Sequence, residues 1–77
     1  MIAETHADRI INLLARVPGL DDDEIARELA IQPRQTVNQV CRRLAACGTL
    51  IRERGIGGKI VNRLQEQIDV LASEVAH

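Results

Sequence analysis

Aromatic residues are missing from this chain: none of its 77 residues is Phe, Tyr or Trp. Hydrophobic residues nevertheless make up 45% of the sequence, so a folded core must be built from Leu, Ile, Val and Ala. A chain of this length forms one small domain. Domains of this size are often only marginally stable, and association with a second copy is a common way to bury more apolar surface.

Long apolar runs and targeting features are missing as well. No stretch approaches the roughly 20 consecutive apolar residues that a transmembrane helix needs. The first ten residues, MIAETHADRI, have neither the basic region nor the apolar core of a signal peptide. We therefore expect a cytoplasmic protein that makes no contact with a membrane.

Cysteine and histidine are too few to suggest a metal or cofactor site. Cys41 and Cys47 are six residues apart, which fits neither a CxxC motif nor a zinc knuckle. On a helix their thiols would lie about 120° apart, which disfavours a mutual disulfide. Burial as small apolar side chains is the simpler interpretation, with a redox sensor or Fe–S ligation as the alternative. His6 and His77 lie near the two ends of the chain. The sequence contains no plausible pair of a nucleophile and a general base, so we do not expect an enzyme.

Charge is unevenly distributed, although the net charge is only −1. Residues 1–31 have three Arg against seven acids, a net charge of −4, and residues 64–77 have a net charge of −3. Residues 32–63 carry seven basic side chains and a single acid, Glu53, a net charge of +6. A localised positive field of this kind favours binding to a polyanion such as DNA.

The most informative stretch is QPRQTVNQVCRRLAACGTLI, residues 32–51. Pro33 and Gly48 are typical of a helix start and a helix end, which predicts a helix over residues 33–47. At about 100° per residue, one face is apolar: Val37, Val40, Cys41, Leu44 and Cys47. The opposite face has amides and guanidiniums but no acid: Gln35, Asn38, Gln39, Arg42 and Arg43. Such groups hydrogen-bond adenine and guanine edges, so we expect this helix to enter a DNA major groove.

Two capping signals precede this helix. Thr5 with Asp8 predicts a helix from His6 to Arg16, which Pro18-Gly19 ends. Asp21 with Glu24 predicts a second helix that ends near Ala30, and the acids there complement the helix dipole better than they would bind a cation. A short turn then leads into the helix at residues 33–47. The second helix, the turn and this helix together form a helix-turn-helix.

A hairpin is predicted after Gly48. Two short β-type runs, residues 50–54 and 59–62, flank a tip with three glycines in four residues. No GKS or GKT sequence follows the glycines, which argues against a phosphate-binding loop. Basic residues stand on both shoulders of the hairpin: Arg52, Arg54, Lys59 and Arg63.

Residues 64–77 return to a helical period. Leu64, Ile68, Leu71 and Val75 are spaced 4, 3 and 4 residues apart, a seam of two heptads. Two heptads are too short for a stable coiled coil alone. Either the helix folds back on its own domain or it pairs with a second chain. We favour the second, with Ile11 as further interface, because Ile11 lies off the main apolar stripe of its helix.

Residues 20–63 resemble the winged helix-turn-helix of bacterial transcription regulators of the MarR and ArsR kinds. The match is carried by IARELAI at residues 25–31, by Thr36-Val37 and Leu44, and by Gly48-Thr49-Leu50-Ile51. The resemblance implies a mainly α fold with a small β-hairpin, in which three core helices precede the wing and a C-terminal helix. Residues 1–63 would be the DNA-binding domain, and residues 64–77 the dimerisation element of a symmetric dimer.

The function predicted from the sequence is sequence-specific binding of double-stranded DNA by a homodimeric transcriptional regulator, as a repressor or autoregulator. Base edges would be contacted by Gln35, Asn38, Gln39 and Arg42, with Thr36 beside them. Phosphates would be contacted by Arg34, Arg43, Arg52, Arg54, Lys59 and Arg63, with Arg54 or Lys59 free to enter the minor groove. The alternative is a winged helix that binds a protein partner. No small-molecule effector is indicated.

Overall fold

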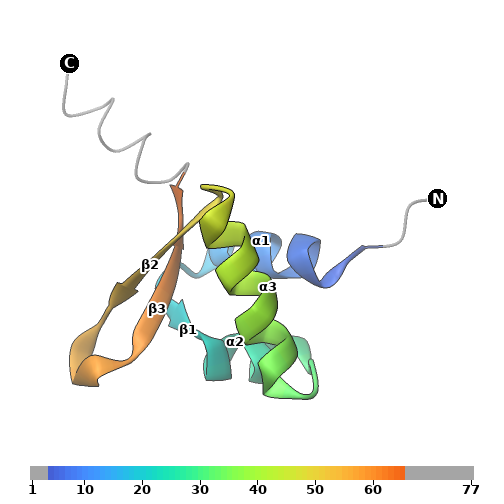
Figure 1. Ribbon diagram of the computed structural model, residues 1–77. Coiled ribbons are helices and arrows are strands. Elements are labelled where there is room, and N and C mark those ends of the chain that lie inside the picture. Colours follow the sequence, from blue (N-terminus) through green and yellow to red (C-terminus); the bar gives the residue numbers. More distant parts are fainter. Residues whose placement is uncertain (1–3, 66–77) are drawn as a thin grey trace.

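The computed structural model describes residues 4–65, and within them three helices pack against one side of a small sheet (Figure 1). The elements are α1 (His6–Arg16), β1 (Leu20–Asp21), α2 (Asp22–Leu29), α3 (Arg34–Ala46), β2 (Leu50–Arg54), a 3₁₀ turn at Ile56–Gly58, and β3 (Ile60–Leu64). This is a winged helix-turn-helix, as the sequence predicted.

The helix ends follow the local capping signals. The Thr5 side chain accepts a hydrogen bond from the backbone N–H of Asp8, and the Asp8 side chain accepts one from the N–H of Thr5. Asp21 and Glu24 form the same reciprocal pair at the start of α2. Gly48 adopts the positive φ expected after α3, at 82°. The predicted bounds therefore hold to within a residue or two.

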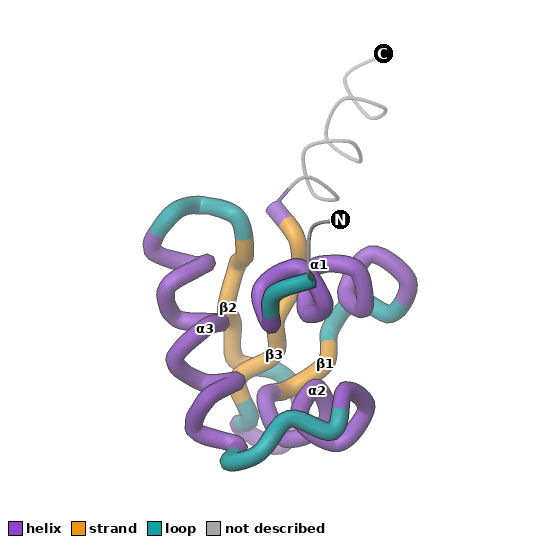
Figure 2. Tube along the Cα trace, turned by 90° about the vertical axis from the view of Figure 1, so that its right-hand side faces the viewer, coloured by secondary structure: helices purple, strands orange, loops and turns teal. Residues whose placement is uncertain are grey.

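The sheet adds a strand that the sequence did not reveal. β2 and β3 form the predicted antiparallel hairpin, from Leu50 opposite Leu64 to Arg54 opposite Ile60. β1 pairs with the other edge of β3, with Leu20 opposite Asn62, so the strand order is β1-β3-β2 (Figure 2). The wing is thereby tied to the segment that leads into α2.

The core is aliphatic and lies between the helices and the sheet. Its buried residues are Ile10, Leu13, Leu14, Ile25, Ile31, Val37, Val40, Cys41, Leu50 and Leu64. Cys41 is buried as predicted, but Cys47 is exposed, because it follows the last turn of α3. The prediction that both thiols are buried was therefore wrong for Cys47.

The structure corrects the predicted role of Leu64. Leu64 is the last residue of β3, not the first of a helix, and only 6% of it is exposed. It lies with Asn62 on the buried side of the strand, so it is part of the domain core and not of a helical dimer seam. Ile11 is partly buried against the core. Ile68, Leu71 and Val75 lie outside the described residues.

Candidate nucleic-acid interface

The outer face of α3 is exposed and rich in hydrogen-bond donors. Val37, Val40 and Cys41 hold the inner face in the core. The exposed side chains along the helix include Gln35, Gln39, Arg42 and Arg43. Among residues 4–65, the ion pairs that form involve neither Arg42 nor Arg43. Both guanidiniums are therefore available to an anionic partner.

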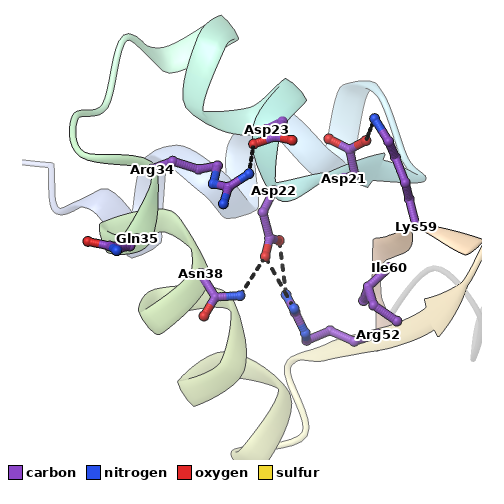
Figure 3. Close-up of a pocket in the computed structure, with 9 residues that line it drawn as sticks. All are labelled: Asp21, Asp22, Asp23, Arg34, Gln35, Asn38, Arg52, Lys59 and Ile60. Carbon is purple, nitrogen blue, oxygen red and sulfur yellow. Dashed lines mark hydrogen bonds and ion pairs between the residues drawn. The ribbon is translucent and has the colours of Figure 1, made fainter.

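An open cavity of about 410 Å³ separates α3 from the wing (Figure 3). Arg34, Gln35 and Asn38 line it on the α3 side. The wing side and the start of α2 supply the other lining residues: Arg52, Lys59, Ile60, Asp21, Asp22 and Asp23. Helix α3 and the wing thus border one hollow from opposite sides.

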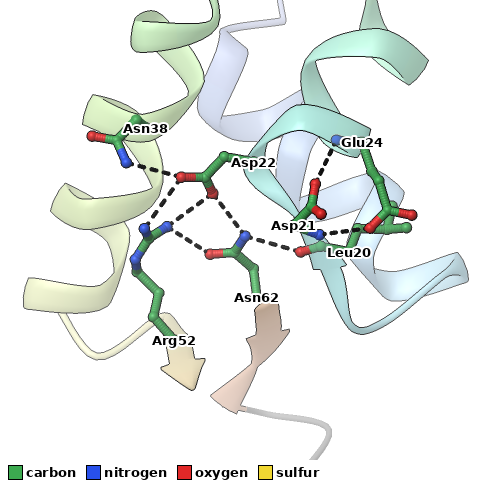
Figure 4. Close-up of polar contacts among 7 residues, drawn as sticks. All are labelled: Leu20, Asp21, Asp22, Glu24, Asn38, Arg52 and Asn62. Carbon is green, nitrogen blue, oxygen red and sulfur yellow. Dashed lines mark hydrogen bonds and ion pairs between the residues drawn. The ribbon is translucent and has the colours of Figure 1, made fainter. Parts of the chain in front are cut away.

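Asp22 is the centre of a hydrogen-bond network beneath this hollow (Figure 4). Arg52 donates to both carboxylate oxygens, from Nη1 at 3.0 Å and from Nη2 at 3.2 Å. Nδ2 of Asn38 and Nδ2 of Asn62 each donate to the carboxylate at 2.9 Å. One side chain at the start of α2 therefore links α3 to both strands of the wing.

Asn62 completes the network from a fully buried position. Its Nδ2 also donates to the carbonyl of Leu20 at 3.0 Å, and its Oδ1 accepts from Nη1 of Arg52 at 2.9 Å. Both ends of the amide are thus hydrogen-bonded, as a buried polar group requires. The network fixes the position of the wing relative to α3. Sequence reasoning missed it, although an Asn directly after the apolar pair Ile60-Val61 of a strand was a usable signal.

The network also sets the charge state of Asp22. Burial alone would raise its pKa, but the hydrogen bonds from Arg52, Asn38 and Asn62, helped by the charge of Arg52, outweigh burial and hold the pKa below the ordinary value of 3.8. The opposite happens to the thiol of Cys41, whose pKa is raised to about 12 by burial and by the negative charge of Asp22. A thiol that stays protonated is chemically inert.

In the folded structure, four of the basic residues that were predicted to contact DNA form ion pairs with acidic side chains. Arg52 is bound to Asp22, and each of these side chains is only 16% exposed. Surface pairs join Arg34 to Asp23 at 2.7 Å, Lys59 to Asp21 at 3.6 Å and Arg63 to Glu53 at 2.7 Å. The sequence suggested seven available cations in residues 32–63, whereas the described structure leaves three of them outside ion pairs: Arg42, Arg43 and Arg54.

Two of the side chains predicted to contact DNA are already engaged within the fold. Arg52 is held inside the network and is a structural residue, not a surface cation. Asn38 is partly buried, and one N–H of its amide donates to Asp22. The three surface ion pairs hold their cations less firmly than the network holds Arg52, because each exposed pair contributes only about 0–1 kcal/mol to folding stability. Arg34, Lys59 and Arg63 can exchange a carboxylate for a phosphate at small cost.

Membrane and metal features are missing from the described part of the chain. Between residues 4 and 65, no helix is long and apolar enough to cross a bilayer. The same residues contain no group of three His, Cys, Asp or Glu side chains that could hold a metal ion.

Solved structures of transcription regulators share this fold. The PcaV transcriptional regulator from Streptomyces coelicolor, in complex with its natural ligand, superposes with a TM-score of 0.73 at 25% identity, covering 96% of this chain and 56% of that one. The transcriptional regulator SlyA gives a TM-score of 0.67 at 15% identity, covering 97% of this chain and 56% of its own. The MarR family protein Rv2887 from Mycobacterium tuberculosis, in complex with salicylic acid, gives 0.59 at 26% identity, covering 92% and 54%.

These likenesses confirm the winged helix-turn-helix that the sequence predicted. No family model and no curated protein matches the sequence. The chain spans about half the length of the regulators that it resembles. PcaV and Rv2887 are seen with bound small molecules, whereas the sequence of this chain gave no indication of an effector.

Proposed function

We propose that this domain binds double-stranded DNA as a transcriptional regulator, with α3 in the major groove. The observation that carries the proposal is the exposed face of α3, where Arg42 and Arg43 have no ion pair among the described residues and the helix itself contains no acid. The fold that the chain shares with PcaV and other transcriptional regulators supports it. None of these neighbours is named as an enzyme.

The hollow between α3 and the wing suits the shape of DNA. In a duplex, one phosphate backbone separates each major groove from the adjacent minor groove. With α3 in the major groove, this ridge would run over the hollow and the wing would reach the minor groove. Arg34 and Lys59 line the hollow and would turn from their acids to the phosphates. Such contacts position the protein, while side chains in the groove select the sequence.

In this proposal, the exposed amides of α3 and the guanidinium of Arg42 recognise the bases. Gln35 and Gln39 would pair with base edges, with Thr36 beside them, and Arg42 would pair with guanine. Arg43, Arg54 and the surface-paired Arg63 would contact phosphates. These side chains form the proposed interface after Arg52 and Asn38 are assigned to the fold.

Regulation would follow from a symmetric dimer. Two copies would place their α3 helices in successive major grooves, about one helical turn apart, on a palindromic site. The dimer contact through Ile11 and residues 66–77 remains a prediction. A dimer bound at a promoter would act as a repressor in the cytoplasm, at the nucleoid.

Replacing Gln39 with alanine tests the role of α3 in sequence selection. The variant should lose about 1–3 kcal/mol of binding free energy at one base position and tolerate any base pair there. Selection from a random duplex library, followed by titration of single-base variants, measures both effects. Asn12→Ala serves as the control, because this exposed amide lies on α1. Equal losses on selected and scrambled sites would remove Gln39 from base recognition.

A further inference from the structure

Asn38 joins the Asp22 network from α3, but only part of its amide is used there. One N–H on Nδ2 donates to Oδ2 of Asp22 at 2.9 Å. The carbonyl oxygen, Oδ1, lies on the side of the amide away from Asp22 (Figure 3 and Figure 4). Within residues 4–65, this oxygen and the second N–H have no hydrogen-bond partner. Asn38 therefore keeps one acceptor and one donor for a molecule outside the protein.

The chemistry of Asp22 fixes the direction in which this amide points. A carboxylate accepts hydrogen bonds and cannot donate them, so Asn38 cannot turn its carbonyl towards Asp22. Arg52 and Asn62 donate to the same carboxylate, whose side chain is only 16% exposed, so Asp22 is itself held in place. The lowered pKa of Asp22 keeps it ionised at neutral pH. Oδ1 of Asn38 is therefore held facing away from the network.

Asn38 also lies among the side chains of the proposed interface. It is three positions after Gln35 and four before Arg42, and residues at these spacings are neighbours on one face of a helix. Gln35, Gln39 and Arg42 are exposed, and no hydrogen bond within the described part of the chain restrains their side chains. Asn38 differs from them because the network has already set its orientation. A preset amide loses less side-chain freedom on binding than an unrestrained one.

We propose that Asn38 recognises one adenine in the major groove and that Asp22 is the positioning residue for this contact. The inference rests on the proposed function and deepens it. Adenine presents an amino donor at N6 and an acceptor at N7, which match the unused oxygen and the unused N–H of Asn38. Guanine and thymine present acceptors there and cytosine presents a donor, so none of them satisfies both groups. Asp22 thereby determines the choice of a base that it does not touch.

The first experiment tests the adenine contact with base analogues in a duplex that the wild type selects from a random library. Purine lacks the 6-amino group of adenine, and 7-deazaadenine lacks the N7 acceptor. At one adenine, each analogue should weaken wild-type binding about fivefold in fluorescence anisotropy, because each removes half of a bidentate contact. Asn38→Ala should bind all three duplexes equally. If no adenine loses its analogue effect in Asn38→Ala, the inference is overturned.

The second experiment tests the role of Asp22 with Asp22→Asn. An amide at this position can present its own NH₂ group to Asn38, which lets the Asn38 amide turn over and display donors only. The preference for adenine over guanine at the same base pair should fall from about tenfold to about twofold or less. Arg52→Gln is the matched control, because it breaks the network from the wing but leaves the carboxylate. Its adenine preference should persist while its overall affinity falls.

Base preference separates positioning from stability, because a merely destabilised protein loses affinity for every sequence alike. Circular dichroism establishes beforehand that each variant is folded, and the analogue experiment requires no change at Asp22. An unchanged adenine preference in Asp22→Asn, or an equal loss of preference in Arg52→Gln, would overturn the role of Asp22 and leave the proposed function intact. A wild type that binds no DNA would overturn both.

Discussion

Replacing Arg42 and Arg43 together with alanine is expected to weaken binding to random duplex DNA roughly a hundredfold. Each guanidinium supplies a charge-assisted hydrogen bond of about 1.5 kcal/mol to a phosphate or a base, and two such losses amount to about 3 kcal/mol. The salt slope should also fall by up to two units, because up to two fewer phosphates are neutralised. Both side chains are exposed, so the free energy of unfolding should stay nearly constant.

Arg16→Glu is the matched control for this double variant. It changes the net charge by the same two units, but Arg16 is exposed in the last turn of α1, away from the proposed interface. The control should retain most of the wild-type affinity. Equal losses in the two variants would mean that overall charge, and not the face of α3, determines binding.

Replacing Asp22 with alanine is expected to lower the free energy of unfolding by about 3 kcal/mol. The substitution leaves the guanidinium of Arg52 without its partner and removes one acceptor from each of Asn38 and Asn62. Breaking a largely buried ion pair by deleting one member is among the costliest single changes. For a domain of this size, such a loss removes a large part of the total stability. Urea unfolding followed by circular dichroism measures it.

Asp23→Ala is the control, because Asp23 occupies the next position in the first turn of α2. Its side chain is 41% exposed and its pair with Arg34 lies on the surface, so the change should cost less than about 1 kcal/mol. Comparable losses in the two variants would show that the helix dipole, and not the network, explains the role of Asp22.

The lowered pKa of Asp22 adds a pH dependence to this prediction. A carboxyl whose pKa is lower in the folded state contributes stability above its ordinary pKa of 3.8, and that contribution disappears as the pH falls through the folded value. The wild type should therefore lose unfolding free energy below about pH 4, and Asp22→Asn should lose less. Urea midpoints measured from pH 7 to pH 3 on both proteins compare the two slopes.

The sequence predicts those parts of the fold that depend on neighbouring residues. Thr5 with Asp8 and Asp21 with Glu24 are three residues apart, so their capping bonds can be read directly from the chain. The apolar period of α3 and the glycines of the wing tip are local signals of the same kind. Each of them gave the correct element.

The errors come from contacts between residues that are distant in sequence. Asp22 and Arg52 are 30 positions apart, and no local pattern indicates that an acid at the start of α2 neutralises a cation of the wing. Leu64 fitted two periods, as a strand residue two after Asn62 and as the first residue of a helical seam. Pairing with Leu50 across the hairpin decides for the strand. The charge pattern therefore overestimated the number of free cations, because four of the seven form ion pairs with acids.

Titration of the wild-type protein with fluorescent random-sequence duplex DNA across a salt series tests the central claim most directly. The proposed phosphate contacts, by Arg34, Arg43, Arg54, Lys59 and Arg63, predict that log K falls with log salt with a slope of about −4 to −5 per bound protomer. Tight binding at low salt with such a slope is the expected result. No binding at low salt would contradict the account, and the exposed face of α3 would then be a surface for a protein partner.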